Sequence, residues 1–161
     1  MTRILAAVVV VALGLAVWFG VETASLSPST DNAALVDTAA TASVTAEVGD
    51  AVKAVFSYDY ANLARTERAA SEYLIGDAVR QYQAQFASAR SRAAVEKLVR
   101  TTTVRAVGVR SLVGDEASVL LFLDQQTVAQ GGGAPSSSVA QLSVTAKRVD
   151  GRWKLAALVA L

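Results

Sequence analysis

The chain has 161 residues, no cysteine and no histidine, and 15 basic side chains against 14 acidic ones. The missing residue types exclude thiol chemistry and sulfur-ligated metals, and they remove the usual acid–base group of neutral pH. The near-zero net charge argues against nucleic-acid binding, which needs a strong excess of basic side chains.

Residues 4–21 form an uncharged apolar segment, ILAAVVVVALGLAVWFGV. A helix of this length, rising about 1.5 Å per residue, spans roughly 27 Å, close to the thickness of a bilayer's hydrocarbon core. Arg3 precedes the segment and Glu22 follows it, so the positive-inside rule places the rest of the chain outside the cytoplasm. We expect a single-pass anchor in the cytoplasmic membrane, with lipid-facing residues that include Ile4, Leu5, Val8, Val11, Leu15, Trp18 and Val21.

A cleaved signal peptide and a buried core helix are the alternatives to this anchor. The apolar region of a signal peptide usually runs about 7–15 residues and ends at a small-x-small cleavage site. Here Glu22-Thr23-Ala24 puts a glutamate where a small residue is needed, and a core helix of this length normally includes polar positions. We therefore expect an uncleaved anchor at residues 1–21, a linker at 22–31 and one domain at 32–161.

Three helices are expected at the start of this domain. Asp31 or Asn32 is the candidate cap of a helix over residues 33–56, in which Gly49 marks either close packing or a bend. A short helix over residues 64–74 ends at Gly76, and Asp77 caps a third helix over 78–100, with an irregularity at 88–91. Apolar residues recur at three- and four-residue spacing on the first helix (Val44, Val48, Ala51, Val52, Val55) and on the third (Val79, Tyr82, Phe86, Ala89, Ala93).

Four strands are expected after the helices, at residues 101–113, 117–128, 139–149 and 153–161. Gly114-Asp115 and Asp150-Gly151 are hairpin turn signals, and residues 130–138 form a flexible loop. The second strand is apolar on both faces as far as Asp124, and the last places Trp153, Leu155, Ala157 and Val159 on one face. Helices followed by meander strands indicate an α+β domain, with the helices covering one face of an antiparallel sheet.

Several motifs of the domain occur in a recognisable order behind the single anchor. They are Ser57-Tyr58-Asp59-Tyr60-Ala61-Asn62-Leu63, Leu74-Ile75-Gly76-Asp77, Val107-Gly108-Val109, ASVLLFLDQ at residues 117–125 and Asp150-Gly151-Arg152-Trp153. Over about residues 32–161 this order resembles the actinobacterial Mce-associated membrane proteins. One departure is Ala78, where that family's pattern has an aromatic residue.

The resemblance implies a cone-shaped domain like nuclear transport factor 2, in which three helices pack on a curved antiparallel sheet of about four strands. It also implies an accessory role, outside the cytoplasmic membrane, in Mce complexes that import lipids such as fatty acids or sterols. The expected partners are therefore the membrane, Mce transporter subunits and, through them, lipid.

Enzymes with this cone fold carry an acid, a tyrosine or a histidine in the pocket, and Tyr58, Asp59, Tyr60, Tyr82 and Asp124 are the candidates here. In the alternative interpretation Tyr58 and Tyr60 pack at a helix end with Asp59 solvated between them, and Asp124 lies at a strand end near the rim. No glycine-rich loop precedes a helix to hold a phosphate. We expect no catalytic residue, no cofactor and no metal.

Seven basic residues and one acidic residue, Glu96, lie between residues 80 and 110. Those of the third helix, Arg80, Arg90, Arg92 and Lys97, are candidates for docking anionic lipid headgroups or an acidic partner. The alternative is a solvated helix face whose charge is balanced by acidic residues elsewhere in the fold.

Together these features predict a non-enzymatic, membrane-anchored accessory subunit of an Mce-type lipid importer. One alternative is an envelope-tethered isomerase or hydratase on the same fold. The other is an assembly module resembling the inner-membrane scaffolds of secretion machines.

Overall fold

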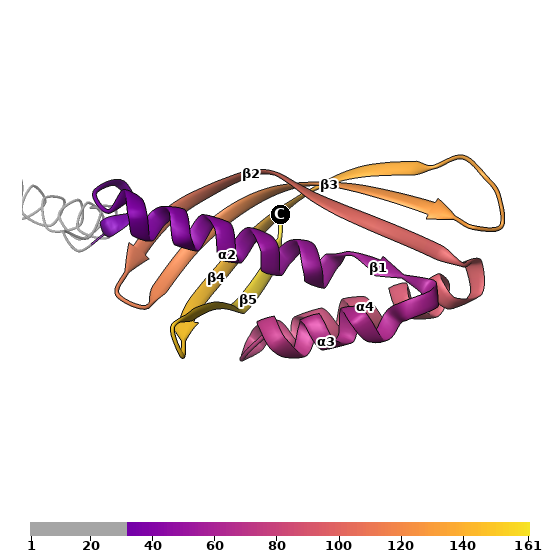
Figure 1. The fold of residues 1–161 in the computed structure, drawn as a ribbon, viewed down its shortest axis with the longest axis horizontal. Coiled ribbons are helices and arrows are strands. Elements are labelled where there is room, and N and C mark those ends of the chain that lie inside the picture. The colour runs from indigo at the N-terminus through magenta and orange to yellow at the C-terminus, as the bar shows by residue number, and fades with distance from the viewer. Residues whose placement is uncertain (1–31) are drawn as a thin grey trace, which may run out of the picture. The chain divides into compact units, whose positions relative to one another are not determined.

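The computed structural model describes residues 32–161, so the expected anchor and linker at residues 1–31 lie outside the described residues. The helical elements are η1 (Ala33–Leu35), α2 (Thr38–Phe56), η2 (Tyr60–Asn62), α3 (Leu63–Tyr73) and α4 (Asp77–Glu96). The strands are β1 (Tyr58–Asp59), β2 (Leu98–Val113), β3 (Glu116–Ala129), β4 (Ser136–Val149) and β5 (Arg152–Ala160) (Figure 1). Between residues 32 and 161, none of the helices has the length and apolar composition needed to cross a membrane.

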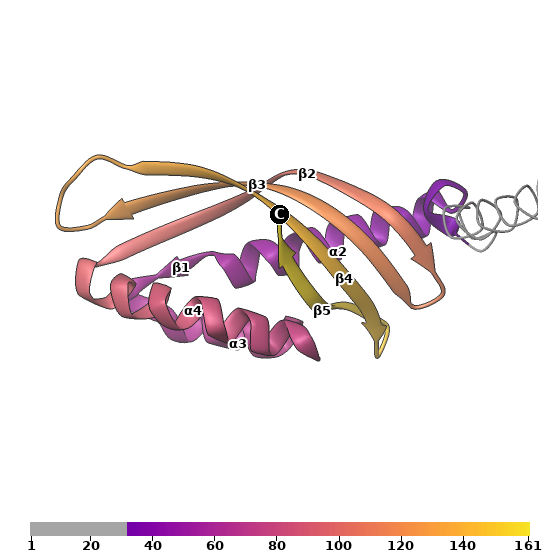
Figure 2. The same cartoon turned by 180° about the vertical axis from the view of Figure 1, so that it is seen from behind.

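The five strands form one antiparallel sheet in the order β1-β2-β3-β4-β5. The sheet is strongly curved, and α2, α3 and α4 lie on its concave side (Figures 1 and 2). The expected α+β architecture, three helices on a curved antiparallel sheet, is confirmed. The sequence did not indicate β1, a two-residue strand that adds Tyr58 and Asp59 to the free edge of β2 opposite Arg100 and Val99.

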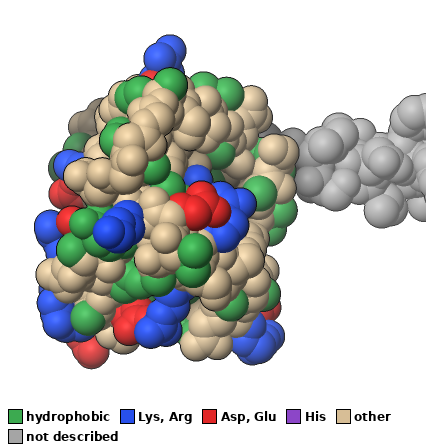
Figure 3. Space-filling model, turned by 90° about the vertical axis from the view of Figure 1, so that its right-hand side faces the viewer, with side chains coloured by type: hydrophobic (Ala, Val, Ile, Leu, Met, Phe, Trp, Pro, Cys, Tyr) green, Lys and Arg blue, Asp and Glu red, His purple; other side chains and the backbone are tan. Residues whose placement is uncertain are grey.

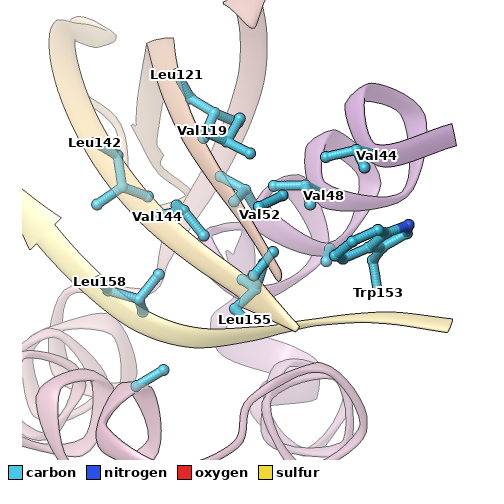
Figure 4. Packing of buried hydrophobic residues seen from close by; sticks show 14 of the residues in the cluster. Val44, Val48, Val52, Val119, Leu121, Leu142, Val144, Trp153, Leu155 and Leu158 are labelled. Carbon is cyan, nitrogen blue, oxygen red and sulfur yellow. The ribbon is translucent and has the colours of Figure 1, made fainter. Parts of the chain in front are cut away.

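The core is formed between α2 and the concave face of the sheet. The valine stripe predicted for the first helix is confirmed, because Val44, Val48 and Val52 are fully buried. These side chains point from α2 toward β3, β4 and β5 (Figure 4). Their neighbours on the sheet include Val119, Leu121, Val144 and Leu155, each of them fully buried. Each of these valines and leucines contributes about 1.5–3 kcal/mol of burial energy, so this layer makes a large contribution to the stability of the domain.

The first helix begins later than the sequence predicts. Asn32 caps only the single 3₁₀ turn η1, and its Oδ1 accepts a hydrogen bond from the Ala34 N–H at 3.1 Å. Asp37 then provides a second cap, accepting from the Ala40 N–H at 2.8 Å, and α2 starts at the next residue. The predicted helix over residues 33–56 is therefore divided in two, because two side chains compete to cap it.

Asn32 also links this turn to the edge strand β2. Its Oδ1 accepts from the Leu112 N–H at 2.9 Å, and its Nδ2 donates to the Arg110 carbonyl oxygen at 3.2 Å. A side-chain amide thus satisfies two backbone groups at a place where β2 has no neighbouring strand.

The ends of α4 also differ from the prediction. Gly76, at φ +56°, is the residue before the helix, and Asp77 is its first residue rather than its cap. The helix ends at Glu96 instead of residue 100, because Lys97 adopts the left-handed conformation (φ +51°) and β2 begins at Leu98. No irregularity occurs at residues 88–91. The loop after β3 is likewise shorter than predicted, since β4 starts at Ser136.

A β-bulge in β5 changes which residues face the core. Thr145 pairs with Ala157, but the next residue of β4, Ala146, pairs with Leu155, so Ala156 is an extra residue. Trp153 and Leu155 are buried as predicted, whereas the prediction that Ala157 and Val159 share their face is wrong. The bulge turns Leu158 inward instead, 5% exposed against 51% for Val159.

On the convex face of the sheet, an apolar side chain of β3 is exposed. Leu121 and Leu123 of β3 are buried on the concave face, but Phe122 between them is 38% exposed. The strand is apolar on both faces, as its sequence indicates, but this does not bury both faces, because all three helices pack on the same side of the sheet.

Candidate functional site

Three hollows among the described residues lie beside the core. The first is a cleft of about 500 Å³ between α2, α3 and the start of β2. The second, of about 700 Å³, is a polar trough on the convex face of β2, β3 and β4. The third is a groove of about 590 Å³ between α3 and α4, called the α3–α4 groove below.

Tyr58 and Asp59 lie on opposite faces of β1, because successive strand residues alternate in direction. Tyr58 is 6% exposed, its ring meets that of Phe86 edge-on at 6.5 Å, and the guanidinium of Arg100 lies 5.2 Å from its centroid. Asp59 is exposed and caps η2 by accepting from the Ala61 N–H at 2.9 Å. The two side chains therefore do not meet in a pocket, and each has a structural role.

Asp124 lies in the middle of β3 on the convex face, rather than at a strand end near the rim as predicted. Its Oδ2 accepts a hydrogen bond from Arg105 Nε at 2.8 Å. Hydroxyl and amide side chains surround this pair in the trough, among them Thr101, Thr103, Gln126, Ser137 and Ser138. The trough is therefore polar, and its one carboxylate is paired.

The four candidate docking residues lie on α4 and at its C-terminal cap. Arg80 pairs with Asp77, and Arg90 Nη1 lies 2.6 Å from Glu67 Oε1. Arg92 and Lys97 have no acidic side chain within ion-pair distance in the part of the chain that the structure describes. Figure 3 shows basic side chains interspersed with acidic ones over one face of the molecule. Two of the four candidate docking residues, Arg80 and Arg90, are thus each paired with an acidic side chain.

The α3–α4 groove combines an apolar lining with a buried phenol. Its apolar wall includes Ala70 and Leu74 from α3 and the segment after it, and Val79, Phe86 and Ala87 from α4. Tyr82 is 6% exposed, and its ring stacks on Phe86 at 4.9 Å and meets Phe56 edge-on at 6.2 Å. Its Oη is buried and has no hydrogen-bond partner among residues 32–161. A buried donor without a partner costs about 1–3 kcal/mol, so it needs an explanation.

The electrostatics of the groove come from one ion pair at its edge. Burial, and then the negative charge of Glu67, raise the pKa of the Tyr82 phenol well above its usual range, so this hydroxyl stays protonated at physiological pH. The paired oxygen of Glu67 is itself buried, and Arg90 approaches it without hydrogen-bond alignment.

Part of the lining of this groove was predictable from the sequence. Helical spacing predicts Tyr82 and Phe86 on one apolar stripe, which is confirmed by their packing. Glu67 was missed, because nothing in a single sequence indicates that a side chain on one helix pairs with Arg90 on another.

Comparison with protein-family models finds no match. Two curated relatives, the uncharacterized proteins Rv1362c and MT1407 from two strains of Mycobacterium tuberculosis, are each 33% identical over 119 residues. The matched region is 73% of this chain and 54% of theirs, so the chain spans about half the length of these relatives.

Solved structures give a closer comparison of the fold. The periplasmic domain of DotI has a TM-score of 0.64 and 15% identity, covering 74% of this chain and 94% of that one. The VirB8 protein of Agrobacterium tumefaciens has a TM-score of 0.60 and 14% identity, covering 74% and 90%. An IcmL-like type IV secretion system protein from Legionella pneumophila has a TM-score of 0.61 and 10% identity, covering 74% and 91%.

The chain has the fold of these domains. As in these structures, three helices pack on a curved antiparallel sheet, which is the architecture expected from the sequence. Identities of 10–15% establish this architecture alone and carry over no activity.

Proposed function

We propose that this protein is a non-enzymatic accessory subunit of the cell envelope, anchored in the cytoplasmic membrane by residues 4–21. Its domain, residues 32–161, would face away from the cytoplasm and hold partner subunits together. The observation that carries this proposal is the fold, shared with the periplasmic domain of DotI over 94% of that domain. The charge asymmetry around the apolar segment supports the same orientation.

A non-catalytic role is supported by how the fold uses three of its five candidate acid–base groups. Asp59 caps a 3₁₀ turn, Tyr58 packs against Phe86, and Asp124 pairs with Arg105 on the open face of the sheet. General acid–base catalysis needs a positioned group within hydrogen-bond reach of a bound substrate. A side chain that caps a turn, packs in the core or forms a surface ion pair is poorly placed to exchange a proton with a substrate.

The specific system that we propose is an Mce-type lipid importer. The support is the ordered set of motifs in residues 57–63, 74–77, 107–109, 117–125 and 150–153, which resembles Mce-associated membrane proteins. In this role the anchor keeps the domain beside the transporter at high effective concentration. The basic residues of α4 and of its C-terminal cap, Arg92 and Lys97 above all, are the proposed contacts to an acidic partner or to lipid headgroups.

The test is cross-linking of the affinity-tagged full-length protein in living cells, followed by detergent extraction and mass spectrometry. We expect cross-links to subunits of an Mce transporter, formed by lysines and acidic residues of the domain. A matched control carries Arg92→Gln and Lys97→Gln, which should lower the cross-linking yield if α4 docks. Recovery of the protein without transporter subunits would contradict the proposal.

A second candidate is an assembly module like the scaffolds of secretion machines. It is favoured by one observation, that the similar solved structures include a type IV secretion system protein from Legionella pneumophila. The same cross-linking experiment separates the two candidates, because a secretion scaffold would be recovered with secretion-machine components instead.

A further inference from the structure

The α3–α4 groove has the form of a small-molecule site. Its volume of about 590 Å³ lies inside the range of roughly 300–1,000 Å³ that is usual for ligand pockets. Its wall is mostly aliphatic and aromatic, with Leu74, Val79 and Phe86 as its largest apolar members. An apolar pocket with a few convergent polar groups is the usual composition of such sites.

Two polar atoms in the lining of the groove are buried without a hydrogen-bond partner among the described residues. Tyr82 Oη is buried without a partner among the described residues, although its residue is only 6% exposed. Glu67 Oε1 is likewise buried, and it forms an ion pair of 2.6 Å with Arg90 Nη1 that lacks hydrogen-bond alignment. One polar atom can donate and the other can only accept. A single bound group that bridges them would satisfy both.

We propose that the α3–α4 groove binds a small apolar molecule that carries one neutral hydroxyl group. The ligand oxygen would accept a hydrogen bond from Tyr82 Oη, and the ligand proton would be donated to Glu67 Oε1. The hydrocarbon part of the ligand would pack against Leu74, Val79 and Phe86. This site goes beyond the accessory role proposed above and does not depend on the identity of the partner subunits.

Charge decides between an alcohol and a carboxylate as the ligand's polar group. A carboxylate headgroup would put a second negative charge beside Glu67 and has no proton to donate to it. Arg90 is already paired with Glu67 and projects into solvent, with a side chain that is 57% exposed. Burial and the charge of Glu67 raise the pKa of the Tyr82 phenol, so the two buried polar atoms without a hydrogen bond are one donor and one anionic acceptor, while Ser71, Gln83 and Arg90 line the groove more openly. A neutral hydroxyl matches both.

The test uses the full-length protein in lipid nanodiscs with tyrosine labelled by ¹³C at Cζ. The chain has four tyrosines, which are assigned by single Tyr→Phe substitutions. Hexan-1-ol and hexanoate are the probes, since they share a chain length and differ in their headgroup. We expect hexan-1-ol to shift the Tyr82 resonance saturably while that of Tyr60 stays in place. Hexanoate should bind about tenfold more weakly, the loss expected for one hydrogen bond and a like charge.

Glu67→Gln and Glu72→Gln are the matched variants, because both remove one negative charge from α3. Glu72 pairs with Arg152 and does not line the groove. Glu67→Gln should reduce the preference for hexan-1-ol over hexanoate to about threefold or less, whereas Glu72→Gln should leave it near tenfold. The proposal is overturned if Tyr82 shows no saturable shift, if all four resonances move together, or if wild type binds hexanoate as well as hexan-1-ol.

Discussion

Truncation of Trp153 to alanine tests the packing of β5 on α2. Trp153 is 3% exposed, its ring lies between β5 and α2 (Figure 4), and its backbone N–H donates to Glu47 Oε2 at 3.0 Å. Removing a buried tryptophan typically costs about 3–5 kcal/mol. The indole Nε1 has no hydrogen-bond partner among residues 32–161, so its removal relieves a desolvation cost, and we expect the lower half of that range.

The size of the domain converts this loss in unfolding free energy into a shift of the melting temperature. With about 2.1 cal/mol/K of unfolding entropy per residue, a domain of this size loses roughly 4 °C for each kcal/mol. Trp153→Ala should therefore lower the melting temperature by roughly 10–15 °C.

Thermal unfolding of the full-length variants, followed by circular dichroism in one detergent, measures this shift. The control is Val159→Ala on the same strand, where the side chain is 51% exposed and the shift should stay below about 4 °C. A melting temperature of Trp153→Ala within about 2 °C of wild type would refute the packing described for this strand.

Three further perturbations test separate contacts. Leu158→Ala should lower the free energy of unfolding, measured with denaturant, by about 2–5 kcal/mol, because the bulge at Ala156 buries Leu158. A loss no greater than that of Val159→Ala would place the bulge elsewhere. Asn32→Ala should lower the free energy of unfolding by about 1–3 kcal/mol, because it leaves the Leu112 N–H and the Arg110 carbonyl oxygen unpaired. Asn32→Asp should lose less, because it keeps the oxygen that accepts from the Leu112 N–H. Equal losses for both variants would contradict the link between Asn32 and β2. The raised pKa of Tyr82 predicts a pH effect in the alkaline range. The stability that the neutral phenol provides is fully present below its unfolded pKa of about 10 and is lost as the pH rises above it, by up to about 1.4 kcal/mol per pH unit. Tyr82→Phe should lack this slope, and parallel stability curves for the two proteins between about pH 9 and pH 11 would exclude the shift.

The elements that the sequence predicted well are those with a strong period. The valines of α2 and the alternation of Leu142 and Val144 in β4 each bury one face, as their spacing requires. Asp150 and Gly151 both have positive φ, at +51° and +77°, which is the backbone geometry that an Asp-Gly hairpin turn needs.

The features that the sequence did not reveal are those without a period. A two-residue strand such as β1 has no alternation to detect, and the extra residue Ala156 shifts a strand face without changing its composition. For Gly49 the sequence left close packing and a bend open. A Cβ there would lie at an ordinary van der Waals distance, 4.0 Å, from Val107 Cγ2, so the packing around α2 does not require a glycine at this position.

The candidate site was partly predictable for the same reason. Periodicity placed Tyr82 on the buried stripe of α4, but the lack of a partner for its hydroxyl depends on what α3 brings across the groove. Glu67 and Arg90 come together only through the packing of two helices, which single-sequence patterns do not encode.

Lipid uptake in a strain deleted for this gene is the most direct test of a non-catalytic accessory role. Asp59→Asn keeps the oxygen that caps Ala61, and Asp124→Asn loses only an exposed ion pair, so both proteins should fold normally. Both should restore uptake to within about twofold of wild type, whereas loss of a catalytic acid or base typically costs about 10²–10⁴-fold. Replacing residues 1–21 with a cleavable signal peptide should impair uptake, because the freed domain loses its effective concentration beside its partners. If either aspartate variant abolishes uptake while it stays folded and bound to its partners, the accessory role is contradicted and an enzyme takes its place.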